Sequence, residues 1–124
     1  MSRYLTIKDV LEFHAALIDR FGGIHGVRDE GALESAVARP QNGYYSDMIE
    51  AAAAMWESLS QNHPFLDGNK RVAITATVVF LDINGYRVTF NDSEAYTWLM
   101  ERYETGTVRK AVLDEWLRAQ IRLT

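Results

Sequence analysis

Over most of the chain, apolar side chains recur with the period of an α-helix. Between residues 10 and 21 they lie three and four positions apart, and Gly22-Gly23 ends the stripe. Thr6 lies just before the stripe as an N-cap, and Asp9 follows three positions later, where a carboxylate also favours the helix dipole. The pattern predicts a first helix that begins after Thr6, with a loop at residues 22–28 behind it.

Capping residues and prolines predict the next two helices. Asp29 can cap a short helix through Ala38, which Pro40 then ends because it lacks an N–H group. Asp47 can cap a third helix through about Gln61, after a turn-rich connection. The proline that follows shortly afterwards stops this helix, since the residue before a proline avoids the helical region.

The most apolar stretch of the chain, residues 72–83, predicts a fourth helix. We expect it to begin at Asp67 or Gly68 and to run to Asn84, with Gly85 just beyond its end. Its β-branched middle is similar to a buried strand, but its length and the Asn-Gly stop favour a helix. Because it is apolar on nearly all sides, we expect it to be the buried central helix.

The C-terminal third predicts one short extended segment and two more helices. Residues 86–90 have an extended pattern, and Asn91 or the residue after it caps a fifth helix that stops near Gly106. Thr107 begins a sixth helix, which carries Ile121 on its apolar side. No internal repeat or linker interrupts these elements.

Together the elements predict an all-α fold, a single compact domain over residues 1–124 with about six helices around a buried central helix. The composition agrees, because 48% hydrophobic and 24% charged residues are typical of soluble globular proteins. The net charge of −4 argues against direct nucleic-acid binding, and the absence of cysteine excludes disulfides and cysteine-bound zinc. Residues 72–83 are too few to span a bilayer and no signal-peptide pattern opens the chain, so we expect a cytoplasmic protein without a membrane partner.

Candidate chemistry is concentrated between His63 and Arg71, where the chain leads into the fourth helix. A helix N-terminus attracts anions, and Gly68 lets the backbone approach a ligand closely. Lys70 and Arg71 fall in the first turn of the helix, where the dipole disfavours cations. Two cations in this position make sense if a phosphate group binds beside them.

Two further side chains complete a set for phosphoryl or nucleotidyl transfer. His63 is suited to take a proton from a hydroxyl group near neutral pH. Asp67 offers an oxygen ligand for Mg²⁺, which takes one or two protein carboxylates together with nucleotide phosphates. Each part alone has a structural explanation, as a turn, a helix cap or a solvated helix start. Their combination within nine residues favours chemistry.

The other histidines are expected to be structural. His14 falls on the apolar stripe of the first helix and is predicted to be a buried, hydrogen-bonded core residue. His25 lies in a glycine-rich loop and is expected to face solvent. Three scattered histidines show no spacing typical of a metal site.

The segment from His63 to Arg71 resembles the signature of the Fic/Doc family, which has the form His-Pro-Phe-x-(Asp/Glu)-Gly-Asn-x-Arg. Upstream, Gly22-Gly23 and residues 26–29 and 33–36 resemble the death-on-curing (Doc) branch of this family. The resemblance covers essentially the whole chain and implies the Fic/Doc fold. The residues that match the signature are His63, Pro64, Phe65, Asp67, Gly68, Asn69 and Arg71.

Two departures distinguish the chain from the adenylylating Fic enzymes, which carry Gly-Asn-Gly-Arg-x-x-Arg. Here Lys70 replaces the second glycine and Ile74 the second arginine. The Doc branch shares the lysine, and the resemblance implies a protein kinase-like phosphotransferase that moves the γ-phosphate of ATP to a threonine of translation elongation factor Tu. It also implies a toxin of a toxin–antitoxin module, which blocks translation and is inhibited by a cognate antitoxin. A protein adenylyltransferase and an inactive binding module stay open as alternatives.

The resemblance implies a role for each residue of the motif. His63 is the general base, and Asp67 holds Mg²⁺. Lys70 and Arg71 are catalytic because they neutralise the charge that develops during transfer. Thr75, one turn further along the helix, is a weaker phosphate contact. The backbone amides that cradle the phosphate are those of Gly68, Asn69 and Lys70.

The implied antitoxin needs a surface on which to bind. Exposed apolar side chains on the outer helices are expected to form part of a groove for an antitoxin helix, since tryptophan is enriched at the centres of such interfaces. The candidates are Trp56, Trp98 and Trp116.

Overall fold

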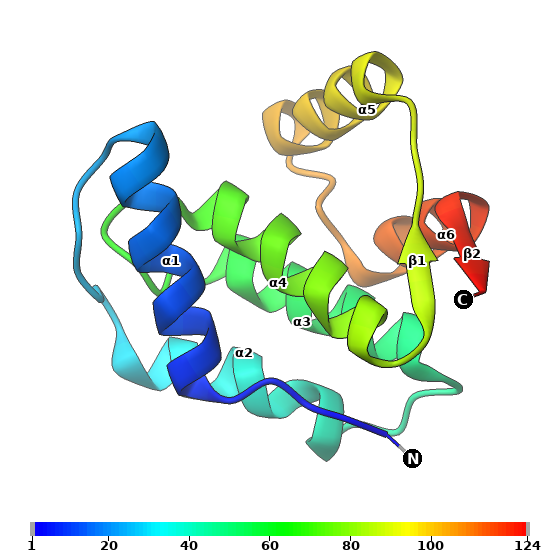
Figure 1. Cartoon of the computed structure of the whole chain (residues 1–124), viewed down its shortest axis with the longest axis horizontal. Helices are drawn as coiled ribbons and strands as arrows, with labels where there is room; N and C mark the ends of the chain where they lie inside the picture. The colour runs from blue at the N-terminus through cyan, green and yellow to red at the C-terminus, as the bar shows by residue number, and fades with distance from the viewer. Residues whose placement is uncertain (1, 124) are drawn as a thin grey trace.

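The computed structural model describes residues 2–123 as six helices and a two-stranded antiparallel sheet (Figure 1). The expected all-α fold of about six helices is therefore confirmed. No helix in this range is both long and apolar enough to cross a membrane. In chain order the elements are α1 (Ile7–Phe21), α2 (Glu30–Asn42), α3 (Met48–Gln61), α4 (Asn69–Ile83), β1 (Tyr86–Val88), α5 (Asp92–Thr105), α6 (Lys110–Gln120) and β2 (Ile121–Leu123).

Four helices begin at the capping side chains that the sequence predicts. At α1 the Thr6 hydroxyl accepts from the Asp9 amide at 3.1 Å, and the Asp9 carboxylate accepts from the Thr6 amide at 2.8 Å. Asp29, Asp47 and Asn91 each accept from the amide three positions ahead, at the starts of α2, α3 and α5. These bonds satisfy backbone amides that lack a partner within the helix, and so they fix where each helix begins.

The centre of the fold is α3, which corrects the expectation that the helix at residues 68–84 is the central one. Nearly all of α3 is buried, including residues 51–54, whose small alanine side chains let α2, α4 and α6 pack closely around it. α4 lies between α3 and α1 (Figure 1). Its buried apolar side chains lie on one face, and those on the other side are only half-buried. The buried ones are Val72, Ala73, Ala76, Phe80 and Leu81, and the half-buried ones are Ile74, Val78, Val79 and Ile83.

α2 runs further than the sequence predicts. It continues through Pro40 to Asn42 instead of ending at Ala38. Pro40 falls in the last turn of the helix and is itself buried, so its ring gains apolar contact where only one helical hydrogen bond is lost. The Gly43 amide closes this turn on the Arg39 carbonyl oxygen at 3.1 Å.

The last helix differs from the expectation at both ends. The Thr107 amide donates to the Arg102 carbonyl oxygen at 2.9 Å and thus belongs to the end of α5, so α6 begins only at Lys110. Ile121 is extended and pairs with Val88 across the small sheet. Of the extended segment expected at residues 86–90, Tyr86–Val88 form β1, and its three-residue partner β2 is too short to give a periodic signal.

α5 is the least buried of the six helices, because only Ala95 on it is fully buried. Figure 1 shows it at the edge of the molecule, beyond α4 and α6. Its inner side contacts the rest of the chain through Trp98, which stacks on Trp116 of α6, and through Tyr103, which is hydrogen-bonded to α3.

Candidate active site

The motif segment forms a loop between α3 and α4 that pairs with the loop after α1. Val27 and Phe65 make an antiparallel bridge, and three backbone hydrogen bonds of 2.7 to 3.1 Å tie residues 26–29 to residues 64–66. Two segments far apart in the sequence therefore frame the start of α4 together.

Arg28 holds the backbone on which His63 is carried. Its Nε donates to the His63 carbonyl oxygen and its Nη2 to the Asn62 carbonyl oxygen, both at 2.6 Å. His63 has a φ of 46°, in the left-handed region, which costs a non-glycine residue about 1–3 kcal/mol. The two charge-assisted hydrogen bonds stabilise this strained backbone. His63 is exposed to solvent, as the base for a hydroxyl of another protein has to be.

The Asn69 side chain closes the loop from the other end. Its Oδ1 accepts from the Phe65 amide and its Nδ2 donates to the Phe65 carbonyl oxygen, both at 3.0 Å. Both polar atoms of the side chain are thus engaged inside the loop. Only the backbone amide of Asn69 is left for a phosphate contact, as the family resemblance implies.

His14 on α1 contacts the buried side of the loop. The prediction of a buried, hydrogen-bonded histidine is confirmed, because only 4% of His14 is exposed and its Nε2 lies 2.8 Å from the Asp67 carbonyl oxygen. A carbonyl oxygen can only accept, so His14 carries its proton on Nε2. Its ring also stacks on Phe65, with centroids 3.8 Å apart and planes 8° from parallel. The sequence did not predict that this core residue contacts the motif. The other outlying histidine, His25, is exposed as expected and is paired with Asp19.

The Asp67 carboxylate is exposed to solvent and keeps acceptor capacity on both oxygens. Its Oδ1 accepts from the Gly68 amide at 2.8 Å and its Oδ2 from the Ile24 amide at 3.1 Å, which leaves further lone pairs on both oxygens. Within residues 2–123, no group of three or more histidine, cysteine, aspartate or glutamate side chains could hold a metal ion. A single exposed carboxylate is the kind of donor that Mg²⁺ takes, since this ion is commonly held by one or two carboxylates with substrate phosphates and water, and the Mg²⁺ site at Asp67 stays a prediction.

Gly68 is the N-cap residue of α4, and no side chain caps this helix. Gly68 has a left-handed φ of 76°, and a Cβ there would lie only 3.1 Å from Cδ1 of Ile18, so both conformation and space favour glycine. The Gly68 amide itself donates to Asp67, and its proposed phosphate contact stays a prediction. The amides of Asn69 and Lys70 follow at the N-terminus of the helix, where backbone N–H groups and the dipole attract an anion.

The two cations of the motif are both exposed, and each lies over an aromatic ring. The Lys70 Nζ is 5.2 Å from the centre of the Tyr103 ring, and the Arg71 guanidinium carbon is 4.6 Å from the centre of the Phe21 ring. Ring faces attract cations, so these contacts favour particular positions of both charges. Thr75 is half-buried one turn beyond Arg71, and its phosphate contact stays a prediction.

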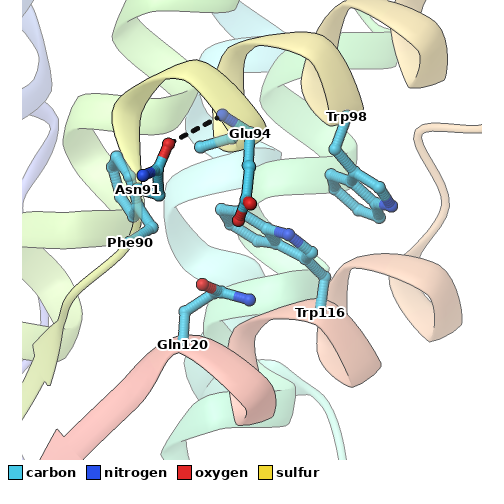
Figure 2. Close-up of a pocket in the computed structure, with 7 residues that line it drawn as sticks. Phe90, Asn91, Glu94, Trp98, Trp116 and Gln120 are labelled. Atoms are coloured by element: carbon cyan, nitrogen blue, oxygen red, sulfur yellow. Dashed lines mark hydrogen bonds between the residues drawn. The ribbon is translucent and has the colours of Figure 1, made fainter.

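The tryptophans expected to form a partner groove fall into two groups. Trp56 is wrong as a candidate, because only 2% of it is exposed and its Nε1 donates to the Tyr103 hydroxyl in the core. Trp98 and Trp116 are half-buried and stack with centroids 4.8 Å apart. They lie beside a pocket between α5 and α6 (Figure 2), which has a volume of about 180 Å³. The other residues that line it are Phe90, Asn91, Glu94, Ala95 and Gln120.

Besides His14, Arg28 and Tyr103 also contact the motif, and the sequence gives no sign of either contact. Arg28 lies 35 positions before His63, in a loop where the sequence shows a resemblance to the family but no role for a single residue. Tyr103 belongs to the apolar side of a predicted helix, where it is indistinguishable from a core aromatic. Only the folded backbone brings either of them to residues 63–71.

Comparison with known proteins identifies relatives along most of the chain. A family model described as Fic/DOC family matches residues 4–81. A protein named Toxin Doc, from Mycolicibacterium smegmatis, is 43% identical over 93 residues, which cover 71% of this chain and 69% of that protein. A protein named Protein kinase doc, from Escherichia phage P1, is 29% identical over 120 residues, which cover 94% of each chain.

Proposed function

This chain belongs to the Fic/DOC family, and on that basis we propose that it is the toxin of a toxin–antitoxin module and a Mg²⁺-dependent protein phosphotransferase that uses ATP. The observation that carries the proposal is the exposed His63 and Asp67 beside an uncapped helix start with Lys70 in its first turn. The names of the two relatives, a toxin and a protein kinase, support both halves of the proposal.

In the proposed reaction, the His63 imidazole takes the proton of a protein hydroxyl group. The hydroxyl oxygen forms a bond to the γ-phosphorus of ATP while the bond between that phosphorus and the bridging oxygen breaks. ADP leaves with the electron pair of the broken bond, and the proton stays on His63. Arg28 contributes by holding the His63 backbone in the conformation that carries the imidazole.

Several groups would neutralise the negative charge of the transferred phosphate. The amides at the start of α4 donate to phosphate oxygens, and Lys70 and Arg71 add two positive charges close to them. Asp67 would hold Mg²⁺, which neutralises charge on the phosphate oxygens when it is bound. Positioning and charge neutralisation account for most of the catalysis in phosphoryl transfer.

Lys70 and Ile74 favour transfer of phosphate over transfer of AMP. Ile74 is half-buried and packs against the hydrophobic core, so this position offers no cation to clamp a polyphosphate. Lys70 places a long side chain where the adenylylating enzymes have glycine, which crowds a pose with the α-phosphate at the amides. A γ-phosphate at the same place needs neither a glycine nor a second arginine. An adenylyltransferase is the second candidate, because it would use the same base and metal ligand.

The proposed target and partner follow from the resemblance to the Doc branch. The target is a threonine hydroxyl of elongation factor Tu, whose modification would block translation. The partner is a cognate antitoxin that inhibits the toxin. The complete set of His63, Asp67 and Arg71 argues against an inactive binding module, since a site without activity has no need of its base and its metal ligand together.

Label transfer from ATP tests the proposal. The protein is incubated with purified elongation factor Tu, MgCl₂ and ATP that carries ³²P on either the γ- or the α-phosphate. We expect label on the target only from γ-labelled ATP, only when Mg²⁺ is present, and not with the His63→Ala protein. Label from α-labelled ATP favours the adenylyltransferase, and no label from either rejects elongation factor Tu as the target.

A further inference from the structure

Tyr103 connects the least buried helix, α5, to the centre of the fold. Its hydroxyl oxygen accepts from Nε1 of Trp56 at 3.1 Å and lies 2.8 Å from the Ser60 hydroxyl, and both of these residues are on α3. Burial raises the pKa of Tyr103, so the phenol keeps its proton at neutral pH and can donate to Ser60. Because Trp56 and Ser60 are buried, these two hydrogen bonds hold the ring in one place.

The face of the same ring lies under the Lys70 ammonium. Nζ is 5.2 Å from the ring centre, a distance at which an aromatic face attracts a cation. Lys70 stands in the first turn of α4, where the helix dipole repels it. No carboxylate in the described part of the chain forms an ion pair with Lys70. The Tyr103 ring is thus the contact that opposes the dipole.

We propose that Tyr103 is a positioning residue that holds the Lys70 ammonium beside the phosphate cradle at the start of α4. The inference rests on the proposed function, since it assumes that Lys70 acts on the phosphate during transfer. A lysine side chain is a flexible four-carbon stem, and a ring under its ammonium reduces the freedom that must be lost in the transition state. α3 fixes the ring before any substrate binds, so the position of Lys70 is prepared in the free protein.

Substitutions at Tyr103 separate the ring from its hydroxyl. Tyr103→Phe keeps the ring under Lys70 and removes the hydrogen bonds to α3, whereas Tyr103→Leu removes both. Tyr103→Gln removes the ring but keeps an oxygen that can accept a hydrogen bond from Trp56. This variant replaces Tyr103→Leu in the experiment if the leucine variant does not fold. Tyr96→Leu is the matched control, because Tyr96 lies on the same helix and is 68% exposed.

We expect kcat at saturating ATP to fall about two- to fivefold in Tyr103→Leu and Tyr103→Gln, the range that corresponds to one exposed cation–π contact. Tyr103→Phe keeps the ring but loses the bonds that hold it, so its rate falls between those of the wild type and the ring-less variants, and Tyr96→Leu retains the full wild-type rate. In a Lys70→Met background the leucine and glutamine substitutions cause no further loss. A purely structural role of Tyr103 would instead lower the rate by the same factor in both backgrounds, and this result would overturn the proposal.

A measurement that needs no activity tests the contact itself. The ring current of Tyr103 should shift the NMR signals of the Lys70 side-chain methylene protons upfield in the wild type and in Tyr103→Phe. The shift should vanish in Tyr103→Leu or Tyr103→Gln. Unchanged Lys70 signals in the ring-less variants contradict the proposal. A wild-type protein that shows the shift but transfers no phosphate overturns the proposed function, and with it any role of Tyr103 in transfer.

Discussion

The Arg28 guanidinium donates from Nε to the carbonyl oxygen of His63 at 2.6 Å. Among residues 2–123, His63 is the one non-glycine residue whose backbone has a positive φ. The same guanidinium also donates to the neighbouring carbonyl of Asn62. Only arginine offers two such donors in a rigid planar fork. The strained conformation of the proposed base is therefore stabilised by one side chain from the loop after α1.

This relationship predicts the effect of changing Arg28. Arg28→Lys keeps the positive charge but cannot donate to both carbonyls in the same geometry, so His63 loses its fixed position. We expect kcat to fall about 10- to 100-fold, the scale that a small misplacement of a catalytic group produces. Initial-rate assays with the protein target measure it. Arg87→Lys, on the exposed residue of β1, is the control, and an equal loss in both variants would reject the role of Arg28.

His63→Ala removes the proposed base. His63 is exposed and contributes little packing, so the variant should fold normally and keep its circular dichroism spectrum. We expect transfer to fall by about 100- to 10,000-fold, as is typical when a general base is lost. Toxicity on expression in cells should be lost in parallel. A soluble His63→Ala protein with wild-type activity would refute the assignment.

Asp47 predicts a pH dependence of stability. It caps α3, and its two oxygens accept from the Arg118 guanidinium at 2.8 and 2.9 Å. The hydrogen bonds from Arg118 hold the pKa of this carboxyl below its usual range. A lowered pKa in the folded state means that the contribution to stability is complete above the unfolded value of about 3.9 and is lost as the pH falls through the folded value.

Urea unfolding at several pH values measures this contribution. Asp47→Asn keeps an N-cap but loses the charge, so it should be less stable than the wild type at pH 7 and nearly equal to it well below pH 3.9. Asp47→Ala also loses the cap, which lowers the free energy of unfolding by about 0.5–2 kcal/mol at any pH. A difference between wild type and Asp47→Asn that does not shrink in acid would contradict the role of the charge.

The pocket beside Trp98 and Trp116 predicts where the proposed antitoxin binds. Trp98→Ala removes half of the stacked pair at the pocket between α5 and α6 (Figure 2). We expect it to weaken the complex by about 2 kcal/mol or more, as the loss of a central tryptophan often does. Co-purification and calorimetry with the protein encoded by the adjacent open reading frame measure the change. An exposed control, Tyr96→Ala, should bind as the wild type does, and equal binding by Trp98→Ala would exclude this surface.

Local features of the fold could be predicted from the sequence because their causes lie within a few residues. The caps at Thr6, Asp29 and Asp47 each involve an amide three positions away, and the sequence places them correctly. The end of α2 could not be placed in this way, because burial of Pro40 against the rest of the chain overrides the usual effect of proline.

The motif residues were recognisable, but their supports were not. His63 and Asp67 are neighbours in the sequence, and their chemistry is evident from residue type and spacing. His14 contacts Asp67 across 53 positions, and Arg28 contacts His63 across 35. No periodic or compositional signal encodes contacts of this kind, since they depend on how α1 and the loop behind it fold against α4.

The mass of the modified target tests the central claim most directly. Elongation factor Tu is incubated with the protein, ATP and Mg²⁺, and its intact mass and peptides are compared with those from a reaction with His63→Ala. We predict a gain of one phosphate group on a threonine with the wild-type protein and no gain with the variant. A gain of a whole nucleoside monophosphate would contradict it, because the α-phosphate and not the γ-phosphate would then be the one transferred.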